Sequence, residues 1–173
     1  MAFHKLDFEL DEEVDGTHLI VPFVDGRPFE DLVEQYELQN NMDAAGGYGG
    51  MVAEGCDLDA LPDYFRGLRH SYPEARRIPR WRRARHGGRL PLGTGRQRIQ
   101  VLSCGGCGEG GCWPGEVLVT AGPEQVTWVD FRNPHRPARD YSGFGFLFDR
   151  RQYDDALASL AGQVRRLQPS PRD

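Results

Sequence analysis

The chain has 173 residues, of which 39% are hydrophobic and 27% are charged, and its formal net charge at pH 7 is −5. This length fits one domain that buries a core of its own, so folding needs neither a disulfide nor a metal. The first residues are acidic, and the longest apolar run, residues 19–24, contains a proline and is too short for a signal peptide or a membrane span, which predicts a cytoplasmic protein with no membrane partner.

The first third of the chain predicts a hairpin followed by a helix. Residues 3–10 alternate apolar and polar side chains, residues 17–24 read as a second extended segment, and Asp15-Gly16 lies between them as a turn signal. Pro28 suits a first helical turn, and apolar residues then recur at helical spacing. We therefore expect a helix over residues 28–38 that covers one face of the sheet.

An arginine-rich segment follows a glycine-rich loop at residues 40–56 and a short helical turn at residues 58–65. Its prolines and its lack of apolar periodicity predict an insertion-like loop near residues 66–97. The stretch Arg76–Arg85 has the charge and the stacking aromatic, Trp81, of a nucleic-acid-binding arm. A solvated loop over the acidic first third explains the same composition, and the negative net charge of the chain favours that alternative.

The pattern of strands resumes after this segment. Residues 98–102 predict a strand that ends in a cysteine-rich loop, and residues 115–120 and 125–131 predict a hairpin. Within that hairpin, simple alternation places Val126, Trp128 and Asp130 on one face. Residues 144–148 predict one further strand.

The chain ends in a predicted helix. Asp149 stands three residues before Gln152 in the spacing of a helix cap, and an apolar stripe continues over residues 149–167. Residues 168–173 have no means of burying surface, so we expect a frayed tail. The whole pattern predicts a single α+β domain over residues 1–167, with a mostly antiparallel sheet, two main helices and a cysteine knuckle at a strand end.

Three of the four cysteines lie within nine positions, at Cys104, Cys107 and Cys112, with glycines between them. Thiolates this close together in a reducing compartment favour a soft metal, and zinc takes mixed sulfur and nitrogen ligands. The fourth ligand is not local: His135 is the first candidate and Cys56 the second. A tight turn that holds no metal explains the same spacing.

Two other chemistries fit the same thiols. Cys104 and Cys107 have the spacing of a redox dithiol, although such pairs usually begin a helix and this one follows a strand. A nucleophilic cysteine could pair with His135, oriented by Asp130 or Asp140. For His135 the alternative is a loop histidine that hydrogen-bonds to the backbone.

A polar loop follows the predicted hairpin. Arg132, Arg136, Asp140 and Tyr141 are candidate ligand-binding residues, because arginine binds anions through two parallel hydrogen bonds. In the architectural alternative, Arg136 or Arg139 pairs with Asp140 or caps strand carbonyls, and the aromatic rings nearby belong to the core. Sequence leaves both open.

Four motifs occur in a fixed order: residues 102–114, Val126-Thr-Trp, Pro134-His-Arg, and the helix start Phe148-Asp-Arg-Arg-Gln-Tyr153. This series resembles an uncharacterised family of small bacterial proteins, of actinobacterial type, with a Cys-x-Cys-Gly-x-x-Gly-Cys-Trp-Pro element. The resemblance covers residues 98–160 and implies no activity. In this chain the first two cysteines are one residue further apart than in that element, and the arginine-rich segment is longer.

Two functional hypotheses follow. The first is a small binding or adaptor domain, for a protein or a small-molecule partner, whose knuckle binds zinc or forms a tight turn. The alternative is a small metal- or thiol-dependent enzyme with a site between the cysteine knuckle and the loop of His135.

Overall fold

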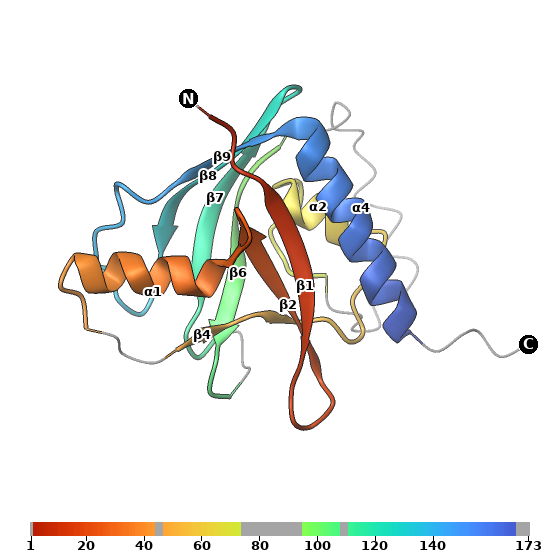
Figure 1. Cartoon of the computed structure of the whole chain (residues 1–173), viewed down its shortest axis with the longest axis horizontal. Helices are drawn as coiled ribbons and strands as arrows, with labels where there is room; N and C mark the ends of the chain where they lie inside the picture. Colours follow the sequence, from red (N-terminus) through yellow and green to blue (C-terminus); the bar gives the residue numbers. More distant parts are fainter. Residues whose placement is uncertain (1, 44–46, 74–94, 108–110, 169–173) are drawn as a thin grey trace, which may run out of the picture.

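Two antiparallel sheets pack together in this protein (Figure 1). The structure is a computed structural model that describes residues 2–43, 47–73, 95–107 and 111–168. In the first sheet, β2 (His18–Val24) pairs with β1 (Leu6–Glu12) on one side and with β3 (Arg27–Pro28) and β5 (Met51–Val52) on the other. The second sheet has the order β4 (Tyr48–Gly49), β6 (Gly95–Cys104), β7 (Gly115–Ala121), β8 (Gln125–Arg132) and β9 (Phe146–Asp149). The predicted α+β fold is confirmed, with its strands divided between two sheets.

Helices α1 (Phe29–Gln39) and α4 (Arg150–Leu167) are the two main helices that the sequence predicts. Asp149 caps α4, since its Oδ1 atom accepts a hydrogen bond from the backbone N–H of Gln152 at 3.0 Å. The short α2 (Leu61–Phe65) packs against α4, which also packs against β1. Figure 1 shows α1 and α4 at opposite ends of the sheets.

Two glutamines of α4 cover the edge of β1 that β2 leaves unpaired. The side-chain amide of Gln152 accepts a hydrogen bond from Leu6 N at 2.9 Å and donates one to Leu6 O, and Gln163 Nε2 donates to Phe8 O at 3.0 Å. An uncovered strand edge invites pairing with another chain. Before β1, His4 N donates to Leu147 O at 2.8 Å, which joins the first sheet to β9.

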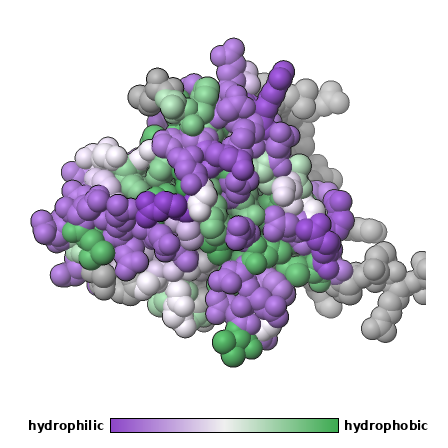
Figure 2. All heavy atoms as spheres, viewed as in Figure 1, coloured by the Kyte–Doolittle hydropathy of each residue, from purple (hydrophilic) through white to green (hydrophobic). Residues whose placement is uncertain are grey.

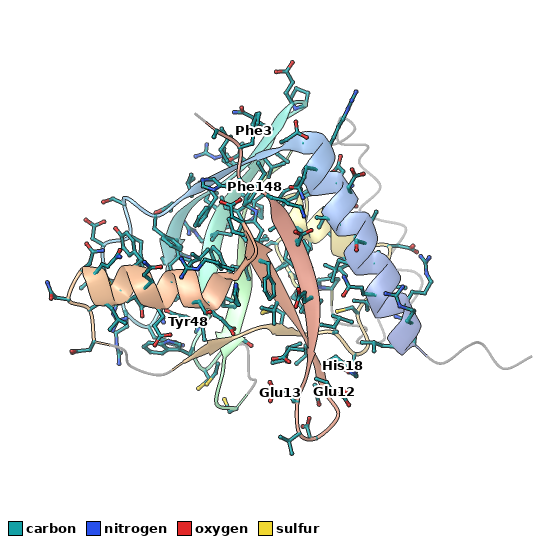
Figure 3. All side chains as sticks on the ribbon, viewed as in Figure 1. Phe3, Glu12, Glu13, His18, Tyr48 and Phe148 are labelled. Atoms are coloured by element: carbon teal, nitrogen blue, oxygen red, sulfur yellow. The ribbon has the colours of Figure 1, made fainter. Side chains whose placement is uncertain are left out.

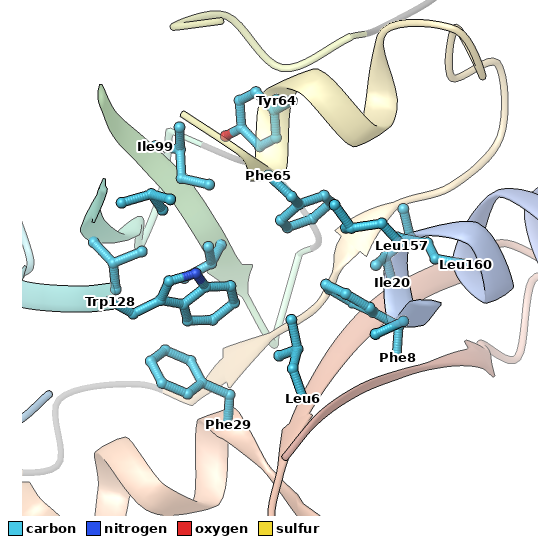
Figure 4. Close-up of a cluster of buried hydrophobic side chains, with 14 of the residues drawn as sticks. Leu6, Phe8, Ile20, Phe29, Tyr64, Phe65, Ile99, Trp128, Leu157 and Leu160 are labelled. Atoms are coloured by element: carbon cyan, nitrogen blue, oxygen red, sulfur yellow. The ribbon is translucent and has the colours of Figure 1, made fainter. Parts of the chain in front are cut away.

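The core lies between the two sheets and is rich in aromatic rings (Figure 4). Trp128 is fully buried; its indole N–H donates to Tyr153 Oη at 2.9 Å, and its ring meets Phe29 edge to face at 5.4 Å. The predicted alternation along residues 125–131 is wrong at its end. Asp130 has φ of 52° at a bulge and is exposed, so Phe131 takes the buried position instead.

The glycine-rich region after α1, expected to be a loop, contains two short strands that connect the sheets. β4 pairs with the end of β6, and β5 pairs with β2. Between them Gly50 lies directly on β2: a Cβ atom added there would stand 2.4 Å from the carbonyl oxygen of Ile20. The hydroxyl of Ser103 donates to Gly50 O, so the same residue is also held by β6.

Gly50→Ala is expected to destabilise the protein by about 1–3 kcal/mol, because the new methyl group overpacks a backbone contact that cannot relax cheaply. Gly47→Ala is the matched control, since a Cβ atom there meets nothing within 4 Å. Urea unfolding of the two variants measures the difference. If both variants unfold at the same urea concentration, the added methyl group at residue 50 is accommodated by a small movement away from β2.

Both ends of the arginine-rich segment belong to the folded structure. Arg66 Nε donates to Asp154 Oδ1 at 2.9 Å, Tyr72 Oη donates to Val52 O at 2.6 Å, and β6 already begins at Gly95. Residues 74–94, which include the whole Arg76–Arg85 stretch, lie outside the described residues, as do residues 169–173 of the predicted tail. The insertion-like loop and the nucleic-acid arm therefore stay predictions.

Hydrophilic residues predominate on the face shown in Figure 2, with apolar residues in smaller groups between them. The exposed large hydrophobic side chains of the described residues come from separate places in the chain: Phe3, Val14, Leu38 and Val129. Within the described ranges, no helix combines the length and the apolar character that crossing a membrane requires.

Candidate metal centre at the end of β6

The three clustered cysteines converge where β6 ends. Cys104 is the last residue of β6, and its sulfur lies with those of Cys107 and Cys112 in a group whose members are all within 4.8 Å of one another. Cys107 and Cys112 are exposed and Cys104 is partly buried. Three sulfurs on one zinc ion at about 2.3 Å stand roughly 3.8 Å apart. The thiols therefore need to close by at most about 1 Å, which exposed side chains can do.

Strand β4 supports the first turn of this loop. Tyr48 pairs with Cys104 and Gly49 with Ser103, and the backbone N–H of Gly105 donates to Gly47 O at 2.9 Å. A Cβ atom at Gly105 would lie 2.8 Å from the carbonyl oxygen of Tyr48. Glycine is therefore required for this close approach, and the glycine-rich residues before β5 help to form the cysteine loop.

The loop stabilises a thiolate at its first cysteine. Backbone N–H groups of Cys107 and Gly106 hydrogen-bond to the Cys104 sulfur and lower its pKa to about 7. Side-chain hydrogen bonds to Cys107 and Cys104 stabilise the protonated thiol of Cys112 and raise its pKa to about 11, and the negative charge of those sulfurs raises it further. A divalent cation would remove that repulsion, so these residues fit a soft metal ion.

The loop after β8 contacts the cysteine loop through His135. Its Nε2 atom lies 2.7 Å from the carbonyl oxygen of Gly111, the residue before Cys112. A carbonyl only accepts hydrogen bonds, so Nε2 is the protonated nitrogen and donates. The His135 side chain therefore contacts the backbone of the cysteine loop. The three-sulfur group does not include its ring nitrogens.

Arg136 adds a second contact between the same two loops. Its guanidinium group lies over the ring of Trp113 at 5.0 Å from the centroid, and its Nη1 donates to His135 O at 3.1 Å. Trp113 follows Cys112 directly, is 9% exposed, and has an indole N–H that is buried without a hydrogen-bond partner among the described residues. The segment 135–136 thus holds the cysteine loop on both sides of Cys112.

Cys56, the second candidate for a fourth ligand, is not part of the three-sulfur group. It is buried in the hydrophobic core, where its thiol lies 3.2 Å from Tyr72 Oη and 3.5 Å from Val52 O. Val52 lies in β5, and Tyr72 lies in the first part of the arginine-rich segment. These contacts give Cys56 a role in packing there.

The other candidate ligand-binding residues make separate contacts within the protein. Arg132 pairs with Glu116 at 2.7 Å, and Asp140 accepts the backbone N–H of Ser142 at 2.9 Å in a local turn. Tyr141 is buried and donates to Glu37 Oε1 at 2.7 Å. Of the four, Arg136 is the one that contacts the cysteine loop.

Sequence reasoning missed a buried polar network beside this site. Glu37 is 3% exposed, and its Oε1 atom accepts hydrogen bonds from Tyr141 and, at 3.3 Å, from Tyr48. Arg139 Nη1 lies 3.1 Å from the same oxygen as an ion pair, without the geometry of a hydrogen bond. Asn133 is 1% exposed and donates to Tyr48 Oη at 3.1 Å. Burial raises the pKa of Tyr48 to about 12, so its hydroxyl keeps its proton.

Glu37 could have been found from its position in the helix. Phe29, Val33 and Glu37 repeat every four residues along α1, and the first two are apolar. A carboxylate in the apolar stripe of a helix must be paired, because an isolated buried charge is costly. The sequence does not reveal its partners, since they come from residues 48, 139 and 141.

Comparison of the chain with protein-family models, with curated proteins and with solved structures gives no match. The resemblance to a family of small bacterial proteins, based on the four ordered motifs, stays a prediction.

Proposed function

We propose that this protein binds one zinc ion through the thiolates of Cys104, Cys107 and Cys112, and that the metal-bound loop serves a binding or adaptor function. The observation that supports this proposal is the convergence of three sulfurs within 4.8 Å at the end of β6. A divalent cation would stabilise the thiolate that the loop already favours at Cys104, and it would compensate for the loss of the proton that hydrogen bonding favours at Cys112.

A structural role for the metal follows from what the loop connects. Zinc held by these thiols would tie the end of β6 to the residues that lead into β7, and so fix the exposed loop beside His135 and Arg136. This rigid, exposed and polar surface suits recognition of a protein or small-molecule partner. Its partner, and a location in the cytoplasm, stay predictions.

The enzyme alternative has one observation in its favour. A thiol with a pKa of about 7 is about half ionised at neutral pH, and its thiolate form is a competent nucleophile. His135, the histidine of the polar loop, uses Nε2 to donate to a backbone carbonyl, so it offers no base to the thiols through that atom. We therefore place binding ahead of catalysis.

We expect the purified protein to contain about one zinc per chain, because three convergent thiols in a partly formed site favour a soft cation, which binds them as thiolates. Elemental analysis of protein purified without chelators gives the ratio, and thermal unfolding with and without chelator gives the stability that the metal contributes. A preparation that lacks metal, takes up no added zinc and melts at the same temperature in chelator would overturn the proposal.

A further inference from the structure

We propose that Tyr48 and Glu37 are positioning residues for the thiol site: a chain of hydrogen bonds that begins at the buried Glu37 carboxylate fixes His135 against the cysteine loop. This inference rests on the proposed function, because zinc affinity is the property through which it is tested. The residues in question lie on α1, on β4 and in the loop after β8, and none of them belongs to the three-sulfur group.

The path begins at Glu37 and can be followed atom by atom. The hydroxyl of Tyr48 donates to Glu37 Oε1 and accepts from Asn133 Nδ2. This fixes which way the Asn133 amide faces, so its Oδ1 atom is the one that accepts the backbone N–H of His135, at 2.9 Å. His135 in turn donates from Nε2 to the carbonyl oxygen of Gly111, next to Cys112.

Tyr48 also contacts residues at both ends of the cysteine loop directly. Its backbone pairs with Cys104 in the sheet, and its ring lies 6.1 Å from that of Trp113, the residue after Cys112. In Figure 3 Tyr48, the first residue of β4, lies beneath α1, the helix that carries Glu37. Tyr48 therefore connects the buried Glu37 carboxylate with Cys104, at the start of the cysteine loop, and with the residue that follows Cys112 at its end.

Burial at two positions keeps these hydrogen-bond partners fixed. Glu37 is 3% exposed and Asn133 is 1% exposed, so neither can exchange its protein partner for bulk water. Hydrogen bonds in such surroundings polarise one another and define a single arrangement. Partners in the second layer around metal ligands fix the orientation of the ligand layer, and their loss typically costs about 10–100-fold in metal affinity.

The test uses Tyr48→Phe in the full chain, which removes one hydroxyl and keeps the ring. Zinc affinity is measured by competition with a chromophoric chelator at neutral pH, and cobalt(II) is used as a spectroscopic substitute. We expect roughly tenfold weaker zinc binding and an altered cobalt d–d spectrum. Tyr36→Phe is the matched control: its hydroxyl contacts Gly143 N at 3.4 Å, its ring stacks on Tyr141, and we expect affinity within twofold of the wild type.

A combined variant separates positioning from general stability. If Tyr48 acts through His135, then Tyr48→Phe adds no further loss of affinity to His135→Ala. Additive losses, unchanged affinity in Tyr48→Phe, or equal losses in Tyr36→Phe would overturn the inference. A variant that lowers the melting temperature of the zinc-free protein but keeps wild-type affinity and cobalt spectrum would overturn it too. Wild-type protein that binds no zinc refutes the proposed function itself, which is a different result.

Discussion

Glu37→Ala is expected to lower the free energy of unfolding by about 3–5 kcal/mol, which is the cost of breaking a buried ion pair by removing one partner. The Arg139 side chain is 11% exposed and that of Glu37 is 4% exposed, so the guanidinium would keep its charge without a carboxylate or much water beside it. The hydroxyls of Tyr48 and Tyr141 would lose their acceptor in the same step. Urea unfolding monitored by far-ultraviolet circular dichroism gives the value.

Glu34→Ala provides the control for that measurement. Glu34 lies one turn before Glu37 in the same helix, α1, and is exposed, so we expect its replacement to change stability by no more than about 0.5 kcal/mol. Both substitutions improve helix propensity equally. If the two variants have the same free energy of unfolding, the ion pair and hydrogen bonds of Glu37 do not contribute to stability.

The strongly periodic elements could be predicted from the sequence. The β1–β2 hairpin, the β7–β8 hairpin and both main helices appear where apolar spacing and turn residues indicate them. Asp149 shows why: a capping residue and an apolar stripe act within a few positions of one another, so the local sequence determines the start of α4. Each of these elements carries its own signal.

The connections between the sheets could not be predicted in the same way. β4 and β5 are two residues long each, and their pairing partners are β6 and β2, which lie far away in the sequence. The bulge at Asp130 likewise depends on its strand partner and on the ion pair with Arg98, not on a periodic pattern. Only tertiary contacts select these features.

The candidate site also has one part that local sequence predicts and another that only tertiary contacts determine. Cysteine spacing predicts that the three thiols converge, because the glycines between them allow a tight loop. Spacing says nothing about the bond from His135 to Gly111 O or about the buried network behind it, since those contacts join residues far apart in the chain. The sequence therefore locates the thiols and leaves their supports undefined.

Cys112→Ser is expected to abolish stoichiometric zinc binding and to remove the stabilisation that zinc gives. A ligand present at about 1,000 times its Kd stabilises a protein by about 4 kcal/mol, so this is the scale of the loss under those conditions. Serine keeps the shape of the side chain but is a poor ligand for a soft metal. Cys56→Ser is the control, because Cys56 lies in the core outside the three-sulfur group and its variant should keep about one zinc per chain.

His135→Ala separates the binding role from the catalytic one when it is compared with Cys112→Ser. His135 contacts the backbone of the cysteine loop, so we expect its variant to keep the fold and about one zinc per chain, with weaker affinity. Elemental analysis and chelator competition measure both quantities. Loss of all bound zinc in His135→Ala would instead make His135 a ligand. A variant that keeps its zinc and fold but loses every cellular effect, matched by Cys107→Ala in a folded protein, would assign the two loops to one active site and favour the enzyme alternative.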